Sequence, residues 1–256
     1  VYFEGEELLS MNSEELRRKR EDFQMVFQNP FSSLDPRYKV FDSIAEPLLV
    51  HRKFSKEEVE KRVYELLELV DLPKELADKY PHECSGGQNQ RVSIARALAL
   101  NPKLVVCDEA VSALDVSVQA NVLELIKKLQ KDLGISFLFI AHDLAVVKMI
   151  SDRVAVMYLG EVVELSSAKN IFENPKHPYT KALIASAPVA DPTKRDRKKI
   201  FLEGEIPKPT DIPSGCPFHT RCPEVTTACL EQVPVLQQIN HAKNAEHQVS
   251  CLLFEE

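Results

Sequence analysis

The sequence is poor in glycine, and none of its seven glycines is followed by lysine. A phosphate-binding loop of the pattern G-x-x-x-x-G-K-[ST] is therefore absent from these 256 residues. No apolar run approaches the roughly 18 residues that a membrane span requires. The first ten residues are acidic and lack the basic start of a signal peptide. These absences predict a cytosolic-type chain.

Positive charge is not in excess either. The formal net charge is −7, which argues against non-specific nucleic-acid binding, because such binding needs a basic face. Hydrophobic residues make up 44% and charged residues 28%, which is ordinary for a globular protein. At 256 residues the chain can bury one large core or two smaller ones.

The N-terminal stretch is unusual for a chain start. It begins with Val1, and the first methionine is Met11. Residues 1–9, VYFEGEELL, read as two short strands around Gly5, which is typical of the middle of a domain. We therefore expect the native polypeptide to extend upstream, with a processed or engineered start as the alternative.

Periodicity and capping residues predict alternating helices and strands. Ser55 and Glu58 form a capping box, and Gly134 provides a helix end. We expect helices at 55–71, 88–100 and 120–133, strands at 103–109 and 135–141, and a hairpin at 153–165 that turns near Gly160. This alternation predicts an α/β architecture with a parallel sheet.

The composition changes past about residue 185. Prolines crowd between Pro188 and Pro217, and a basic run covers 194–199, which we interpret as a solvated linker. We therefore predict two domains, at 1–185 and 186–256.

Two stretches suggest phosphate chemistry. Asp108 and Glu109 end a predicted buried strand, where ligands bind in open α/β sheets. An aspartate there can hold Mg²⁺ and a glutamate can orient and deprotonate water, although two acids at a strand end are often just solvated. Ser85, Gly86 and Gly87 enter a helix and offer an anion site, although a Gly-Gly turn capping a helix is common.

The order of the motifs along the chain favours the functional interpretation of these two stretches. Gln28 follows a β-type run, and His142 follows the strand after the two acids. Together the motifs resemble the ABC-transporter ATPase family: VFQNP (26–30) the Q-loop, ECSGGQNQR (83–91) the signature, LVVCDE (104–109) the Walker B strand, SALD (112–115) the D-loop and IAHD (140–143) the switch-histidine region.

The resemblance implies a role for each matching residue. Glu109 would be the general base and Asp108 would position Mg²⁺. Gln28 would touch the metal and the attacking water and sense a membrane subunit, and His142 would contact the γ-phosphate of ATP.

Further residues would act across a dimer interface. The signature residues would close over ATP that is bound to a partner ATPase; these are Ser85, Gly86, Gly87 and Gln88. Asp115 would communicate across the same interface. Cys84 and Ala110 depart from the usual family residues, but neither change removes a catalytic group.

The family fold would be the ABC-type P-loop NTPase fold, with a parallel core sheet, an antiparallel β subdomain and a helical subdomain. The missing P-loop would lie ahead of Val1, so the 256 residues alone would not bind ATP normally. A natural pseudo-ATPase is the competing explanation.

Other stretches narrow the resemblance. NPFSSLDPRYKVFDSIAEPL (29–48) and HPYTKALIASAP (177–188) resemble the ATP-binding subunits of dipeptide and oligopeptide importers. Residues 111–130 and 205–223 point more weakly to the F-type member of the ATPase pair. The implied function is ATP hydrolysis that powers peptide uptake, with nickel import, a soluble ABC protein of translation or DNA repair, and a non-catalytic metal-binding module as alternatives.

The same resemblance implies the partners. These would be a second ATPase, identical or paralogous, two transmembrane permease subunits and, indirectly, an extracytoplasmic peptide-binding protein, with no nucleic acid. The chain would lie at the cytoplasmic face of the cell membrane.

The last sixth of the chain carries four cysteines spaced C-x5-C-x6-C-x21-C, which is not a zinc-ribbon pattern. In the importer family a comparable extension resembles the ligand set of a [4Fe–4S] cluster, so a small cysteine-rich C-terminal extension is expected to bind one through Cys216, Cys222, Cys229 and Cys251. Zn²⁺ is the alternative, and a disulfide is disfavoured in a cytosolic protein.

The remaining candidates for this tail are less specific. His219 and His247 are possible ligands but are expected to be ordinary surface histidines. Cys84 and Cys107 are expected to be buried thiols. The predicted role of the cluster is structural, because metal binding supplies folding energy to a tail with few apolar residues.

Overall fold

The computed structural model describes residues 1–51, 54–187, 202–239 and 247–254. The chain divides into two compact units, Val1–His142 and Asp143–Glu256. The boundary predicted near residue 185 falls inside the second unit, and the basic run 194–199 lies outside the described residues. The division into domains at 1–185 and 186–256 therefore stays a prediction.

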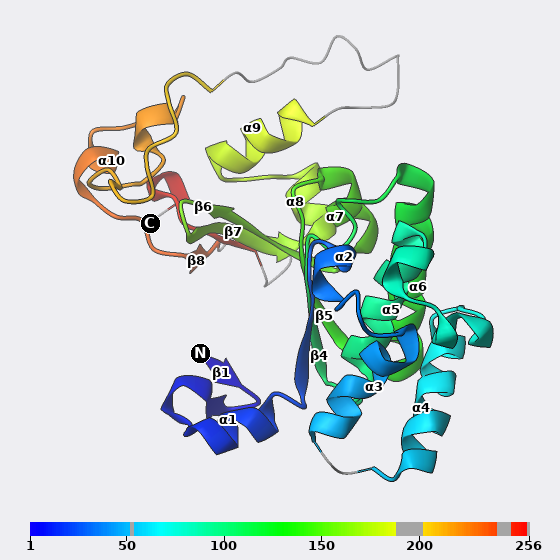
Figure 1. Ribbon diagram of the computed structural model, residues 1–256. Helices are drawn as coiled ribbons and strands as arrows, with labels where there is room; N and C mark the ends of the chain where they lie inside the picture. The colour runs from blue at the N-terminus through cyan, green and yellow to red at the C-terminus, as the bar shows by residue number, and fades with distance from the viewer. Residues whose placement is uncertain (52–53, 188–201, 240–246, 255–256) are drawn as a thin grey trace. The chain divides into compact units, whose positions relative to one another are not determined.

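The first unit is built on a three-stranded parallel sheet in the order β3-β4-β5 (Figure 1). Its strands are β3 (Phe23–Val26), β4 (Leu104–Asp108) and β5 (Ser136–Ile140). Val105 and Cys107 of β4 are buried on one face, and α5 packs against β3. The strands at 103–109 and 135–141 are confirmed, and so is the parallel sheet.

The opposite face of this sheet is apolar and uncovered. Met25, Val106 and Leu138 are neighbours in register across the three strands. Met25 is 37% exposed, Leu138 54% and Ile140 46%. Parallel strands are normally covered on both faces, so the described residues leave half of this sheet without its usual packing.

Helices form the rest of the first unit. The three predicted helices appear as α4 (Lys56–Leu69), α5 (Gly86–Leu98) and α6 (Val116–Leu133). Ser55 and Glu58 form the expected capping box, and Gly134 ends α6 in the left-handed conformation with φ +67°. α6 begins four residues earlier than predicted, because Asp115 caps it. The remaining elements here are α2 (Pro30–Ser33), α3 (Val40–Val50) and the 3-10 turns η2 (Lys74–Asp78) and η3 (Pro81–Glu83).

The N-terminal stretch forms the expected strand–turn–strand. β1 (Tyr2–Phe3) pairs with β2 (Glu6–Glu7), and Glu4 and Gly5 turn the chain with φ of 52° and 84°. The 3-10 turn η1 (Leu8–Ser10) and helix α1 (Ser13–Lys19) follow.

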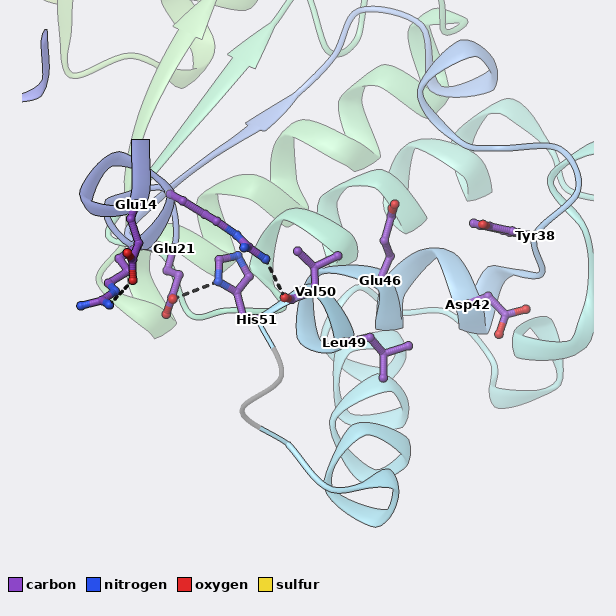
Figure 2. Close-up of a pocket in the computed structure, with 10 residues that line it drawn as sticks. Glu14, Glu21, Tyr38, Asp42, Glu46, Leu49, Val50 and His51 are labelled. Atoms are coloured by element: carbon purple, nitrogen blue, oxygen red, sulfur yellow. Dashed lines mark hydrogen bonds and ion pairs between the residues drawn. The ribbon is translucent and has the colours of Figure 1, made fainter. Parts of the chain in front are cut away.

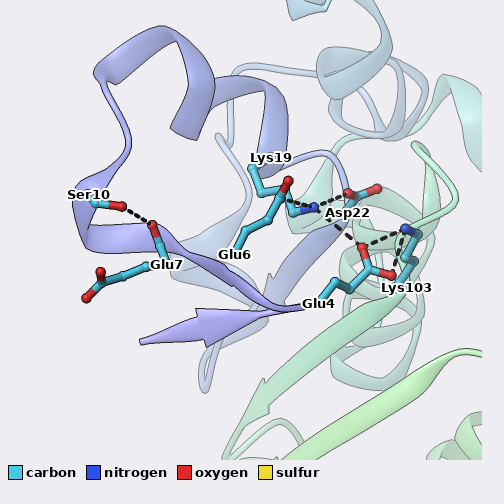
Figure 3. Close-up of polar contacts among 7 residues, drawn as sticks. All are labelled: Glu4, Glu6, Glu7, Ser10, Lys19, Asp22 and Lys103. Carbon is cyan, nitrogen blue, oxygen red and sulfur yellow. Dashed lines mark hydrogen bonds and ion pairs between the residues drawn. The ribbon is translucent and has the colours of Figure 1, made fainter.

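Ion pairs tie this hairpin to the parallel sheet. Lys19 lies 2.7 Å from Glu6, 3.4 Å from Glu4 and 3.5 Å from Asp22, and Lys103, which precedes β4, lies 2.7 Å from Glu4 (Figure 3). Two lysines thus share the carboxylate of Glu4. The Lys103 ammonium lowers the pKa of the Glu4 carboxyl.

The second unit is built on an antiparallel sheet in the order β6-β7-β9-β8. β6 (Arg153–Tyr158) and β7 (Glu161–Ser167) form the predicted hairpin, which turns at Leu159 and Gly160. The tail supplies β8 (Gln237–Gln238) and β9 (Gln248–Val249), so it joins the hairpin sheet. The helices are α7 (Leu144–Ile150), α8 (Ala168–Glu173), α9 (Pro178–Ser186) and α10 (Ala228–Glu231), with 3-10 turns η5 (His219–Arg221) and η6 (Leu252–Phe254).

A buried carboxylate joins three segments of the second unit. Glu164 of β7 is fully buried and accepts backbone N–H bonds from Lys176 (2.8 Å) and His177 (3.0 Å). His247 Nε2 lies 2.7 Å from the same carboxylate. His247 is 1% exposed, so the expectation of a surface histidine was wrong: it packs inside and hydrogen-bonds a residue that is 83 positions away.

Aromatic rings fill the core of the same unit. Tyr158 packs against Phe218 and Tyr179 with ring centroids 5.1 and 4.9 Å apart. Phe218 is 1% exposed and sits two residues after Cys216, so the cysteine-bearing tail shares this core.

None of the helices in the part of the chain that the structure describes has the length and apolarity needed to cross a bilayer.

Candidate functional site

Three predicted catalytic side chains meet at the carboxyl edge of the parallel sheet. Gln28 follows β3, Glu109 follows β4 and His142 follows β5. Gln28 Nε2 donates to Glu109 Oε2 at 2.5 Å, and His142 Nδ1 lies 3.2 Å from Glu109 Oε1. Each carboxylate oxygen of Glu109 thus has one side-chain partner. The Glu109 and His142 side chains are 27% and 69% exposed, so solvent reaches both.

Glu109 is held by its backbone as well. Its φ is 46°, a left-handed conformation that costs free energy in a residue other than glycine. Its N–H donates to the Ile140 carbonyl at 3.0 Å, which extends the β4–β5 pairing by one residue. Ser112 donates its N–H and its hydroxyl to the Glu109 carbonyl at 3.0 and 2.9 Å. Strain of this kind concentrates at functional sites, because the surrounding structure must enforce it.

Asp108 is the last residue of β4 and pairs in register with Ile140. Within the described residues, no three His, Cys, Asp or Glu side chains are arranged to hold a metal ion. A magnesium site usually needs one or two carboxylates plus phosphate oxygens from a nucleotide. The roles of Asp108 and Gln28 in holding Mg²⁺ therefore stay predictions.

The signature residues form the N-terminus of α5. Ser85 Oγ accepts the Gln88 N–H at 3.2 Å, and Gln88 Oε1 accepts the Ser85 N–H at 2.9 Å. This capping box satisfies one donor of the first turn, and the N–H groups of Gly86 and Gly87 have no intrahelical acceptor. The turn thus presents two backbone donors at the positive end of a helix dipole.

The signature turn packs against the segment that contains the predicted D-loop. A Cβ on Gly87 would lie 2.5 Å from Val118 Cγ1, and one on Gly86 would lie 3.5 Å from Leu114 Cδ2. Asp115 caps α6 by accepting the Val118 N–H at 3.0 Å, and that hydrogen bond lowers the pKa of Asp115. This contact between the two motifs was not foreseen, because no sequence pattern marks a close approach of backbone to side chain.

The predicted residues thus fall into two clusters. One holds the side chains of Gln28, Glu109 and His142, and the other holds the signature turn and Asp115. No hydrogen bond found among the described residues joins one cluster directly to the other.

A groove of about 1140 Å³ lies between α1 and α3 (Figure 2). Two contacts close one side: Arg17 Nη2 donates to the Val50 carbonyl at 3.0 Å, and His51 Nδ1 lies 2.9 Å from Glu21 Oε1. Leu49 and Val50 are 56% and 47% exposed beside these charged groups. The groove therefore combines exposed apolar surface with a charged rim.

The four tail cysteines are near one another but form no described metal site. Cys216 donates its N–H to the Cys229 carbonyl at 2.9 Å. Burial, with the nearby Cys216, Cys222 and Cys229 as a smaller cause, raises the pKa of Cys251 to about 11. The donor set suits all-thiolate ligation, yet the side chains as placed do not form a group that would hold an ion.

The backbone around these thiols is shaped in a repeated way. The backbone N–H two residues further on, at Phe218, Glu224 and Leu253, opposes the effect of burial on the pKa of Cys216, Cys222 and Cys251. Gly215 has φ +68°, and a Cβ there would lie 2.4 Å from the Cys229 carbonyl oxygen. Burial raises the pKa of Cys107 to about 12, as expected for a buried thiol, and it also raises the pKa of Cys84.

Two family models match this chain. The ABC transporter model matches residues 1–112, and the model for the oligopeptide/dipeptide transporter C-terminal region matches residues 163–229. The oligopeptide transport ATP-binding protein OppF of Salmonella typhimurium is 52% identical over 250 residues, which are 97% of this chain and 73% of that protein. The chain belongs to the family of ATP-binding subunits of oligopeptide and dipeptide ABC transporters.

Further members of this ABC family are similarly close. AppF of Bacillus subtilis, an oligopeptide transport ATP-binding protein, is 46% identical over 99% of this chain and 77% of its own length. The dipeptide transport ATP-binding protein DppF of Haemophilus influenzae is 47% identical over 95% of this chain and 74% of its own length.

Solved structures show that the chain has the ABC ATPase fold. CbiO1 from Clostridium perfringens, described as part of an ABC transporter complex, matches with a TM-score of 0.62 and 29% identity over 68% of this chain and 67% of that one. The ATP-binding cassette MJ0796, in a dimeric form bound to ADP and phosphate, matches with a TM-score of 0.58 and 31% identity over 65% of this chain and 72% of that one. The predicted α/β fold with a parallel sheet is thereby confirmed.

Proposed function

We propose that this chain is the ATP-hydrolysing subunit of an importer for dipeptides or oligopeptides. The observation that carries this proposal is the cluster of Gln28, Glu109 and His142 at the carboxyl edge of the sheet. Relatives named for oligopeptide and dipeptide transport favour peptides over nickel, and the intact cluster favours an ATPase over a non-catalytic metal-binding module.

Glu109 is the proposed general base. Its carboxylate is partly exposed, and Gln28 and His142 fix both oxygens, so a water molecule beside it would meet an oriented acceptor. Gln28 would also touch the attacking water, and His142 would contact the γ-phosphate. Mg²⁺ held by Asp108 and Gln28 would neutralise charge on the phosphate oxygens of ATP.

The signature turn would act on a second ATPase. Ser85 and the free N–H groups of Gly86 and Gly87 suit the γ-phosphate of ATP bound to a partner, with Gln88 holding the turn closed. Asp115, which starts α6 beside this turn, would transmit the presence of the partner's nucleotide. The partner would be a second copy or a paralogue.

A phosphate-binding loop is needed for this chemistry, and the 256 residues contain none. The uncovered apolar face beside Asp108 supports the proposal that a strand–loop–helix unit bearing this loop packs there.

The remaining partners are two permease subunits in the membrane and, indirectly, an extracytoplasmic peptide-binding protein. The groove between α1 and α3 supports this, because Leu49 and Val50 offer apolar surface to a cytoplasmic segment of a permease. The chain would be peripheral at the cytoplasmic face of the membrane.

The cysteine-rich extension, within the proposed domain 186–256, would bind a [4Fe–4S] cluster with a structural role. The backbone N–H groups that lower the pKa of Cys216, Cys222 and Cys251 against the effect of burial support this, because such groups stabilise thiolate ligands. Anaerobically purified protein is expected to be brown and to contain acid-labile sulfide. Colourless protein with stoichiometric zinc would replace the cluster by Zn²⁺.

The experiment that tests the proposed ATPase is Glu109→Gln in the full-length protein assembled with its partners. Loss of the general base should lower the rate of ATP hydrolysis by about 10²-fold or more, while ATP binding and nucleotide-dependent pairing persist. Glu124→Gln, an exposed acid of α6, is the matched control and should keep wild-type activity. Unchanged turnover in Glu109→Gln would remove Glu109 from the mechanism.

A further inference from the structure

One short helix lies between the two clusters of functional residues. α2 (Pro30–Ser33) begins two residues after Gln28, and its other end contacts α5, the helix that starts with the signature turn. We propose that Ser93 and Arg96 of α5 are positioning residues for ATP hydrolysis, which hold Gln28 against Glu109 by anchoring α2. This inference rests on the proposed ATPase function.

The anchor is made of specific contacts with Ser33. Arg96 Nη1 donates to the Ser33 carbonyl at 2.8 Å, and Ser33 Oγ lies 3.3 Å from Ser93 Oγ. Ser93 is 3% exposed, so water does not compete freely for its hydroxyl. Arg96 also lies 3.9 Å from Glu46 of α3.

The hydrogen bond from Arg96 to the Ser33 carbonyl is the stronger of the two contacts that α5 makes with Ser33. A guanidinium that donates to a carbonyl makes a charge-assisted hydrogen bond. The Arg96 side chain is 20% exposed, and burial lowers its pKa, with Glu46 opposing the shift. Such a group is costly to leave without its acceptor, so α2 is held firmly against α5.

The serine contact is adjustable. Ser33 Oγ also lies 3.1 Å from the Pro30 carbonyl, and Ser93 Oγ lies 3.0 Å from the Asn89 carbonyl. Two hydroxyl protons serve three oxygen–oxygen contacts, so one contact is always unmade. The Ser33–Ser93 bond therefore forms only when one hydroxyl releases its backbone carbonyl, so each hydroxyl always has one acceptor, while the Arg96 bond persists.

The end of the 28–33 segment that carries Gln28 is also held by hydrogen bonds. Asn29 Oδ1 caps α2 by accepting the Phe31 N–H at 3.0 Å, and Gln28 just before it donates to Glu109 at 2.5 Å. Phe31 also faces the signature turn, where its ring lies 3.9 Å from a Cβ built on Gly86. A shift of α5 would thus move α2, and with it the amide of Gln28.

A double-mutant cycle tests this inference on the full-length ATPase assembled with its partner subunits. Arg96→Ala should lower kcat by about tenfold or more, because small misplacement of a catalytic group is costly, while the KM for ATP changes little. Ser93→Ala should have a smaller effect of the same kind. Combined with Gln28→Ala, neither substitution should lower kcat further, because both act through Gln28.

The matched control is Arg62→Ala. Arg62 also donates to carbonyls at the end of α5, at Leu98 (3.1 Å) and the C-cap Ala99 (3.4 Å), but among the described residues it makes no hydrogen bond to α2. The Arg62→Ala substitution should therefore lower the thermal stability of the protein and leave kcat unchanged. If Arg96→Ala does not fold, Arg96→Lys, which keeps a donor, takes its place in the cycle with a smaller predicted loss.

Two results would overturn the inference: effects of Arg96 and Gln28 that multiply independently, or an Arg96 variant that behaves like Arg62→Ala. Failure of the proposed function is recognised separately, because Glu109→Gln would then leave turnover unchanged.

Discussion

At the scale of single residues, Gly87 has no room for a side chain. A Cβ at this position would lie 2.5 Å from Val118 Cγ1, which is far inside van der Waals contact. We predict that Gly87→Ala lowers the free energy of unfolding by about 1–3 kcal/mol, the usual cost of overpacking, and reduces ATPase activity. Urea denaturation measures the first effect.

Two variants separate crowding from other effects of the methyl group. Gly86→Ala places its Cβ 3.5 Å from Leu114, an ordinary contact, and should leave the unfolding free energy unchanged within error. Val118→Ala should restore stability to Gly87→Ala by removing the clashing methyl group. A Gly87→Ala protein as stable as wild type would show that α6 moves aside at no cost.

His177 gives the second unit a pH dependence. Burial lowers the pKa of His177 to about 4 from its ordinary value of 6.5, and its Nδ1 accepts the Tyr179 N–H at 3.0 Å, which requires the neutral ring. The unfolded chain therefore binds a proton between pH 6.5 and about 4 that the folded chain rejects.

We therefore predict full stability above pH 6.5 and a loss that grows as the pH falls toward 4, of about 3 kcal/mol at most. His177→Asn keeps an acceptor for the Tyr179 N–H and does not titrate. Thermal unfolding between pH 4 and 7 should show a flatter pH dependence for this variant; an identical slope would assign the acid sensitivity to other groups.

At the scale of elements, Glu164 connects β7, the start of α9 and the chain just before β9. Its carboxylate accepts two backbone N–H bonds and one from His247 while fully buried. We predict that Glu164→Ala costs about 3–5 kcal/mol, because three donors lose a buried acceptor. Proteolysis of the tail should accelerate in this variant, and Glu161→Ala, on an exposed position of the same strand, should not change the rate.

Elements with local signals were predictable from the sequence. Ser55, Ser85 and Gly134 mark helix ends through their own side chains or backbone freedom, and the structure places α4 to α6 within a few residues of the expected bounds. The short strands β8 and β9 were not predicted, because β9 exists through pairing with β7, far away in the sequence, and β8 through pairing with β9.

The candidate site also combines features that the sequence predicts with features that only tertiary packing creates. Gln28, Glu109 and His142 each follow a strand of one parallel sheet, so their convergence follows from topology and motif order. The anchoring of α2 by Arg96 and the burial of His247 were missed, because each depends on tertiary packing that leaves no periodic or spacing signal.

At the scale of the whole molecule, the two compact units carry different parts of the proposed function. The first holds both clusters of functional residues, and the second holds the cysteine-bearing tail. A substitution in the tail should therefore lower the thermal stability of the protein and leave the rate of ATP hydrolysis nearly unchanged. A Cys216→Ser variant is expected to melt at a lower temperature with kcat for ATP near wild type; a selective loss of kcat would contradict this separation.

The bare side of the three-stranded sheet has a practical consequence for these 256 residues produced alone. Met25, Leu138 and Ile140 would expose an apolar surface to water. This surface would pack against the same surface of another molecule. Sedimentation should then report self-association that grows with protein concentration. Leu138→Lys should suppress it, and a polypeptide that also carried the phosphate-loop unit should stay dispersed.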